Sequence, residues 1–235
     1  SRLADEGYDI SVVTRSVDTV DARLGVAVTG IDRFDKAALA EAVGTADAVV
    51  NLAGESIIGA RWTAAKKERL RSSRIDLTTE LVEAMEHARN RPKVFVSASA
   101  VGFYGDAGDV FCTEATDAGD DFLARLCVDW EAAAYPARNL GVRVVTPRIG
   151  IVLGASGGAL KKMLPAFRLG LGGVVGSGDQ YFSWIHIDDL VGLIAMAIHD
   201  SRFQGAFNAT APNPVTNREF TRALGTVLKR PTVIP

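Results

Sequence analysis

Two short segments, each following an apolar run, carry residues suited to contact a ligand. Arg15 and Ser16 follow the run Ile10–Thr14 and offer a cation and a hydroxyl, two groups that bind phosphate. A second segment has small residues that let the backbone approach a flat ligand; it reads Asn51-Leu52-Ala53-Gly54-Glu55. From these residues alone, Arg15 is better interpreted as a solvated surface arginine, and Gly54 is equally typical of an ordinary turn.

The elements that must position these segments alternate between strand and helix. The runs of strand type are Ile10–Thr14, Gly25–Thr29, Asp47–Asn51, Val94–Ser97 and Val142–Thr146. Apolar residues at helical spacing predict helices over Thr63–Arg89 and Phe122–Leu140, the second ended by Gly141. Repeated alternation of strand and helix predicts an α/β fold, a Rossmann-like doubly wound parallel sheet with helices on both faces.

The sequence changes in character after Arg148, where glycines become frequent and charges fewer. We expect a loop-rich second layer, in which the run Gly154–Gly158 lines a substrate cleft. The later elements are predicted as a strand Tyr181–Ile187, a helix Leu190–His199 capped by Asp188 or Asp189, a strand Ala206–Thr210 and a helix Thr216–Lys229. We therefore predict a dinucleotide-binding domain over residues 1–150 and a mainly substrate-side subdomain over 151–235, with segments returning to the first domain.

The segment Ser1–Gly7 has the pattern of the last turns of a helix with a C-terminal glycine. We therefore expect the first strand of the sheet and its glycine loop to precede Ser1. In the usual strand order 3-2-1-4-5-6 that strand is central, so its absence would weaken both stability and cofactor binding.

Composition excludes several classes of protein. A formal net charge of -2 provides no basic surface for nucleic acid or an anionic membrane. The longest apolar run, Leu190–Ile198, is too short for the roughly 20 residues of a membrane span. Cys112 and Cys127 form no metal-binding or disulfide pattern, so we expect no metal and a reducing, cytoplasmic location.

Four motifs give the sequence a family resemblance. They are Asn51–Glu55, Ser97–Gly105, the pair of segments Phe122–Arg125 and Trp130-Glu131, and Ser183–Leu190. With them the chain resembles the short-chain dehydrogenase/reductase superfamily, and more narrowly its atypical, epimerase-like branch. The resemblance implies that the strand before Arg15 ends at the adenosine ribose, where an arginine and a hydroxyl suit the 2′-phosphate of NADP better than they suit NAD. The candidate cofactor-binding residues are Arg15, Ser16, Leu52, Ala53, Gly54, Glu55, Arg74, Ser97 and Arg148.

Catalysis in the superfamily uses a Ser or Thr, a Tyr that moves a proton, and a Lys four residues later that lowers the pKa of the Tyr and holds the nicotinamide ribose. Here those last two positions fall on Leu123 and Cys127, or on Phe122 and Leu126. Ser99 matches the expected serine. Tyr104 is a substitute phenol or, equally well, an aromatic that packs beneath the cofactor.

Four further polar residues admit two interpretations each. Lys66, Lys67 and Arg74 share one helix and either bind an anion or pair with carboxylates on an outer face. The second interpretation is favoured for the lysines, and the two are balanced for Arg74. His186 is predicted to be a buried, structural imidazole rather than a general base.

Two functions remain open at this point. The first is an NADP-dependent oxidoreductase or epimerase that acts on an unidentified small carbonyl or hydroxyl compound through Ser99 and Tyr104. The second is a non-catalytic NADP-binding redox sensor or interaction protein, which the absent Tyr and Lys favour. The long helices Thr63–Arg89 and Phe122–Leu140 could also pair between two copies of the chain in a homodimer.

Overall fold

The structure is a computed structural model that describes residues 2–57, 61–155 and 157–232. Ser1, Ser156 and Pro235 therefore lie outside the described residues. Contacts divide the chain into two compact units, which are described separately. The first comprises residues 1–99, 126–146 and 194–205, and the second comprises residues 100–125, 147–193 and 206–235. The predicted division of roles at residue 150 stays a prediction.

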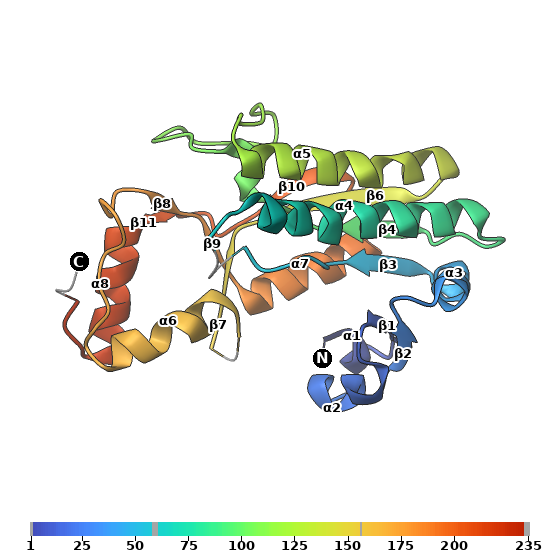
Figure 1. Cartoon of the computed structure of the whole chain (residues 1–235), viewed down its shortest axis with the longest axis horizontal. Coiled ribbons are helices and arrows are strands. Elements are labelled where there is room, and N and C mark those ends of the chain that lie inside the picture. Colours follow the sequence, from blue (N-terminus) through green and yellow to red (C-terminus); the bar gives the residue numbers. More distant parts are fainter. Residues whose placement is uncertain (1, 58–60, 156, 233–235) are drawn as a thin grey trace. The chain divides into compact units, whose positions relative to one another are not determined.

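Helices and strands alternate along the first unit, and they can be followed from blue to green in Figure 1. In chain order they are α1 (Arg2–Asp5), β1 (Ser11–Thr14), the 3-10 helix η1 (Val17–Thr19), α2 (Val20–Leu24), β2 (Thr29–Asp32), α3 (Lys36–Thr45), β3 (Ala48–Asn51), α4 (Ala64–His87) and β4 (Val94–Ser97). Most of α5 (Phe122–Ala134), the 3-10 helix η3 (Tyr135–Leu140) and the first half of β6 (Arg143–Ile149) complete the series.

Every strand pair of the first unit that has a described register is parallel. β1 pairs with β2, β3 with β4, and β4 with β6. Parallel neighbours need crossover connections, and these contain α2 between β1 and β2, α4 between β3 and β4, and α5 between β4 and β6. The predicted α/β class with a parallel sheet is confirmed. Within the described ranges β1 pairs only with β2 and β3 only with β4, and the expectation of a further strand ahead of them stays a prediction.

The core of the first unit lies between the sheet and the helices α3 and α4. All four residues of β4 are buried, as expected for a strand covered on both faces. Against β4 and β6 pack apolar side chains from α3, α4 and the segment after α5, which include Leu39, Val43, Leu81, Met85 and Ala137. Helix α4 begins where the Thr63 hydroxyl accepts a hydrogen bond from the Lys66 amide.

The second unit contains shorter elements. They are the 3-10 helix η2 (Val101–Tyr104), β7 (Ile151–Gly154), α6 (Gly158–Arg168), β8 (Tyr181–Phe182), β9 (Trp184–His186), β11 (Val215–Thr216), α8 (Asn217–Leu228) and most of β10 (Gly205–Ala209). The short β5 (Ser99–Ala100) and α7 (Ile187–His199) cross the division. β7 pairs with β9 in parallel, and β8 pairs with β11 antiparallel. A capping box between Thr216 and Glu219 starts α8.

Several predicted element boundaries were wrong. The strand expected at Gly25–Thr29 is β2, which begins at Thr29, because Gly25 ends α2 in the left-handed conformation and the next residues form a connection. The predicted helix Phe122–Leu140 changes to a 3-10 helix at Tyr135, because Pro136 has no N–H to continue the α-helical bonds. Helices α2 and α3 were not predicted.

The prediction of one continuous strand over Tyr181–Ile187 was also wrong. The segment forms two short strands, β8 and β9, separated by Ser183, whose carbonyl oxygen accepts a hydrogen bond from the Ile151 amide. Helix α7 begins at Ile187, so Asp188 and Asp189 lie within its first turn and do not precede it as a cap.

Candidate functional site

Arg15 and Ser16 lie directly after β1, at its carboxyl end. Both residues are exposed, and the Ser16 amide donates to Thr14 Oγ1 at 3.2 Å. Among the described residues the Arg15 guanidinium makes no hydrogen bond or ion pair. This cation is therefore free to meet an anion at the edge of the sheet, and its assignment to a 2′-phosphate stays a prediction.

The segment after β3 is held to α4 by Asn51. This side chain is buried, its Nδ2 donates to Thr78 Oγ1 at 2.9 Å, and its Oδ1 accepts from the Ala53 amide at 3.2 Å. The turn leaves Leu52 and Gly54 exposed beyond the strand. Asn51 also stands in register with Ser97 of β4, so the carboxyl ends of these two strands are neighbours.

Glu55 is bound to α4 rather than left free for a ligand. Its carboxylate accepts from Lys66 Nζ at 2.6 Å, and Arg69 Nε lies 3.4 Å from its other oxygen. The Lys66 ammonium, with help from Arg69, holds the pKa of the Glu55 carboxyl below its usual range. Lys66 is itself buried and also donates to the Ser56 carbonyl, so its predicted place on an outer face was wrong. The segment after β3 folds back over the start of α4, which helical spacing alone does not reveal.

Arg74 lies against the exposed Gly54. A Cβ added to Gly54 would stand 2.8 Å from Arg74 Cζ, so any other residue here would displace the guanidinium. The guanidinium donates to the carbonyl oxygens of Leu70 and Glu55 at 3.1 and 3.0 Å, and to Ser73 Oγ at 3.4 Å. Burial lowers the pKa of Arg74 from its usual value, while the Cys127 sulfur and the Glu55 carboxylate act in the opposite direction.

A hydroxyl on α4 connects this region to α5. Thr78 is fully buried, and its Oγ1 donates to the Arg74 carbonyl at 2.6 Å while accepting from Asn51 Nδ2 and from Trp130 Nε1 at 3.1 Å. The Trp130 ring in turn lies 5.2 Å from Arg74 Cζ, within the range of a cation–π contact. One hydroxyl thus joins β3, α4 and α5.

Ser97, the last residue of β4, and Ser99, the first residue of β5, have different surroundings. Ser97 is fully buried, and its Oγ has no hydrogen-bond partner among the described residues. Ser99 is buried as well, but its Oγ donates to Glu131 Oε1 at 2.7 Å. The other carboxylate oxygen of Glu131 accepts from the Tyr135 hydroxyl at 3.2 Å. The single proton of Ser99 is therefore directed to Glu131, and its oxygen can only accept from a ligand.

Tyr104 and Arg148 come together in the second unit. The buried Tyr104 hydroxyl donates to Asn208 Oδ1 at 2.7 Å and accepts from Arg148 Nη1 at 3.0 Å. Arg148 is buried too, and its Cζ stands 3.4 Å from the centre of the Phe103 ring. The phenol is thus used both as donor and as acceptor, as in a side chain that holds a loop in place. The assignments of Tyr104 to catalysis and of Arg148 to the cofactor stay predictions.

His186 is exposed, contrary to the buried position predicted for it. Its Nδ1 accepts from the Asp188 amide at 3.3 Å and lies 3.5 Å from the Asp188 carboxylate. The sequence places it in an apolar run, but β9 ends at this residue and only the neighbouring Ile185 points into the core.

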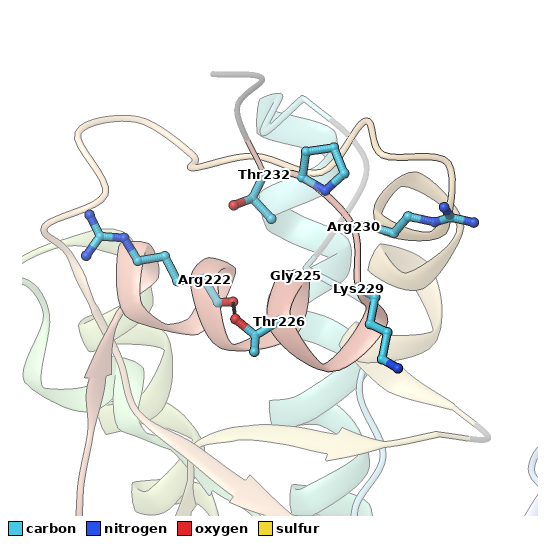
Figure 2. A pocket seen from close by; sticks show the side chains of 7 residues that line it. Arg222, Gly225, Thr226, Lys229, Arg230 and Thr232 are labelled. Atoms are coloured by element: carbon cyan, nitrogen blue, oxygen red, sulfur yellow. Dashed lines mark hydrogen bonds between the residues drawn. The ribbon is translucent and has the colours of Figure 1, made fainter.

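A surface pocket of about 460 Å³ lies at the end of α8, lined by Arg222, Gly225, Thr226, Lys229, Arg230, Pro231 and Thr232. Figure 2 shows that the Arg222 side chain points away from those of Lys229 and Arg230. Arg230 Nε donates to the Arg168 carbonyl oxygen at 2.9 Å. The cations therefore diverge and do not surround a common anion.

The part of the chain that the structure describes contains no group of three or more His, Cys, Asp or Glu residues that could hold a metal ion. None of the helices in that same part is long and apolar enough to cross a lipid bilayer.

Several residues of the site were not predicted from the sequence. Asn51, Trp130 and Glu131 were noted only as motif letters, Cys127 was noted only as a position of the missing lysine, and Thr78 was not mentioned. A usable signal was spacing, because Thr78 lies four residues after Arg74 and so shares its face of α4. The partners on α5 depend on tertiary packing and leave no comparable signal.

Comparisons with known proteins show which sequences the chain is similar to. The sequence profile of the NAD dependent epimerase/dehydratase family matches residues 1–209. The chain is 42% identical over 237 residues to the chloroplastic epimerase family protein SDR39U1 homolog of Arabidopsis thaliana, covering 100% of this chain and 68% of that protein. It is 47% identical over 199 residues to epimerase family protein Mb2239 of Mycobacterium bovis, covering 85% of this chain and 64% of that protein. The chain thus spans about two thirds of the length of these curated relatives.

A solved structure extends the comparison to three dimensions. The human epimerase family protein SDR39U1 (isoform 2), crystallised with NADPH, superposes with a TM-score of 0.81 at 36% identity, over 94% of this chain and 78% of that one. The predicted Rossmann-like fold and epimerase-like resemblance are confirmed.

Proposed function

Because the chain belongs to the NAD dependent epimerase/dehydratase family, we propose that it binds NADP(H) and acts as an oxidoreductase or epimerase on a small carbonyl or hydroxyl compound. The aligned part covers about two thirds of the curated relatives. Activity, substrate and partners of the whole protein are therefore part of the proposal.

Arg15 carries the choice of NADP over NAD. Its guanidinium is exposed at the carboxyl end of β1, without a partner among the described residues and beside the Ser16 hydroxyl. An acidic residue at this position would favour the free ribose of NAD, whereas a cation favours the additional phosphate of NADP. The NADPH in the human relative's structure supports the same choice.

The residues at the other strand ends fit a dinucleotide as well. Gly54 is exposed after β3, and the buried Ser97 Oγ at the end of β4 lacks a partner among the described residues. Bound in this position, the nicotinamide ring would give or take the hydride. The chain itself supplies Ser99, whose oxygen, with its proton directed to Glu131, can hold a ligand hydroxyl or amide group.

A second function is favoured by specific contacts. Ser99 gives its proton to Glu131, Tyr104 is hydrogen-bonded as donor and acceptor, and neither Leu123 nor Cys127 can move a proton as a Tyr and Lys pair does. These contacts favour a protein that binds NADP(H) without catalysis, as a redox sensor or interaction partner.

The NADP assignment is tested by calorimetry with NADPH and NADH, comparing the parent with Arg15→Ala. The measurement is made on the 235-residue chain and on a version extended to the length of its curated relatives. We expect Arg15→Ala to weaken NADPH binding about 10- to 100-fold, the effect of a lost charge-assisted hydrogen bond, and to leave NADH binding unchanged. Arg23→Ala, which removes another exposed arginine from α2, is the matched control. Equal NADPH affinity in the parent and Arg15→Ala contradicts the proposal.

The two functions are separated by NADPH absorbance measured with a panel of sugars, ketones and aldehydes. Substrate-dependent oxidation of NADPH supports the enzyme, and tight binding without turnover supports the sensor. A homodimer formed through α4 and α5, and a cytoplasmic location, are included in the proposal. The Arabidopsis relative is named as chloroplastic.

A further inference from the structure

Helix α5 has an uncharged residue where the family resemblance implies a lysine. In one of the two alignments of the Tyr and Lys positions, the lysine position is Cys127, and in the other it is Leu126. Both residues are buried and neither carries a positive charge. A cation next to the nicotinamide ribose must therefore come from another element.

Arg74 of α4 reaches this part of α5. Its guanidinium lies 5.2 Å from the centre of the Trp130 ring, and Cys127 of the same helix acts to raise the pKa of Arg74 against the larger effect of burial. Cys127 and Trp130 are three residues apart and so lie on the same face of α5. Arg74 thus lies beside the face of α5 that carries Cys127, which favours the alignment that places the lysine position at Cys127.

The charge of Arg74 is not matched by a hydrogen-bonded carboxylate. All three of its described hydrogen bonds go to neutral oxygens, those of Leu70, Ser73 and the Glu55 main chain. The Glu55 carboxylate is instead hydrogen-bonded to Lys66. A half-buried cation without such a partner is costly unless a ligand completes its surroundings.

Arg74 also retains the capacity to bind a ligand. Its hydrogen bonds use three of the five N–H donors of a guanidinium. The Nε–H and one N–H of Nη2 have no acceptor within residues 2–57, 61–155 and 157–232. The side chain is only half-buried, beside the exposed Gly54, so these donors are accessible from the carboxyl edge of the sheet.

We propose that Arg74 supplies, from α4, the positive charge that α5 lacks at Cys127, and that its free N–H groups bind the hydroxyls of the ribose attached to nicotinamide. This inference rests on the proposed binding of NADP(H). It assigns Arg15 and Arg74 to opposite ends of the same ligand.

Two ligands separate a contact at the nicotinamide end from a general structural role. NADPH contains the nicotinamide ribose, whereas adenosine 2′,5′-bisphosphate contains the adenosine end and its 2′-phosphate but lacks that ribose. Binding of each ligand is measured by calorimetry in the version of the protein extended to the length of its curated relatives. The proteins compared are the parent, Arg74→Ala, Arg74→Lys, and Arg74→Ala combined with Cys127→Lys. Arg71→Ala is the matched control, because Arg71 is exposed on the same helix and pairs with Asp129.

We expect Arg74→Ala to weaken NADPH binding about 10- to 100-fold and to change the affinity for adenosine 2′,5′-bisphosphate less than about 2-fold. Arg74→Lys should fall between the parent and Arg74→Ala, and Cys127→Lys should restore at least part of the loss in Arg74→Ala. Arg71→Ala should bind both ligands as the parent does.

The experiment distinguishes failure of the Arg74 inference from failure of the proposed NADP(H) binding. If the parent binds neither ligand, NADP(H) binding itself is refuted. If the parent binds both but Arg74→Ala weakens both equally, Arg74 has a structural role and the inference is overturned. Unchanged NADPH binding in Arg74→Ala and Arg74→Lys overturns it as well, whether or not the double variant folds.

Discussion

Replacing Thr78 with valine removes one hydroxyl from the buried junction of β3, α4 and α5 while keeping the shape of the side chain. The hydroxyl accepts hydrogen bonds from Asn51 Nδ2 and Trp130 Nε1, at 2.9 and 3.1 Å. Thr78→Val therefore leaves two buried donors without an acceptor. Each such group costs about 1–3 kcal/mol, so we expect the free energy of unfolding to fall by about 2–6 kcal/mol.

The loss is measured by urea unfolding, followed by tryptophan fluorescence and circular dichroism to check that the transitions coincide. Thr78→Ser keeps the hydroxyl and should lose only about 1 kcal/mol, the value of one buried methyl group. Thr221→Val is an isosteric control with the opposite expectation, because Thr221 is buried and its Oγ1 has no partner among the described residues. A Thr78→Val protein within about 0.5 kcal/mol of the parent would falsify the assigned network.

Three other predictions concern neighbouring contacts. Arg143→Met removes charge-assisted hydrogen bonds to three carbonyl groups at and after the end of α7. We expect the free energy of unfolding, measured by thermal unfolding, to fall by at least about 2 kcal/mol. An unchanged melting temperature contradicts this prediction. Lys66 lowers the pKa of Glu55, so their contact stabilises the fold at pH values above the unfolded pKa of Glu55. This stabilisation is lost as the pH falls through the lower pKa of the folded state. In Glu55→Gln the free energy of unfolding should therefore fall less steeply with decreasing pH than it does in the parent. Gly54→Ala places a Cβ 2.8 Å from Arg74 Cζ and should weaken NADPH binding, because the guanidinium is displaced. Altered tryptophan fluorescence is the second readout. NADPH affinity and fluorescence equal to those of the parent contradict the contact between Gly54 and Arg74.

The sequence predicted the elements whose local pattern and burial agree. β4 was predicted at its observed bounds because all four residues are apolar or small and lie in a strand covered on both faces. Helix α4 was predicted within two residues at each end, since Thr63 is a cap and Pro92 prevents a longer helix. Such signals act within a few residues and need no knowledge of tertiary packing.

Side-chain partners were harder to predict, because they depend on segments far apart in the sequence. Helical spacing put Lys66 on an outer face, but the segment after β3 covers the start of α4 and brings Glu55 to it. Ser99 was singled out as a candidate from its motif, whereas its acceptor Glu131 comes from another helix 32 residues later. Periodicity indicates which face a residue occupies, and only the packed structure shows what lies opposite.

The Thr78 hydroxyl also limits how this family can diverge in sequence. Because the same oxygen accepts from Asn51 and Trp130, loss of the hydroxyl at position 78 leaves two buried donors without an acceptor, whereas loss of Asn51 or Trp130 leaves the hydroxyl with its remaining partners. Replacing Asn51 and Trp130 by apolar residues first is therefore less harmful than losing the hydroxyl first. Homologues that lack a hydroxyl at position 78 should therefore also lack the asparagine and the tryptophan.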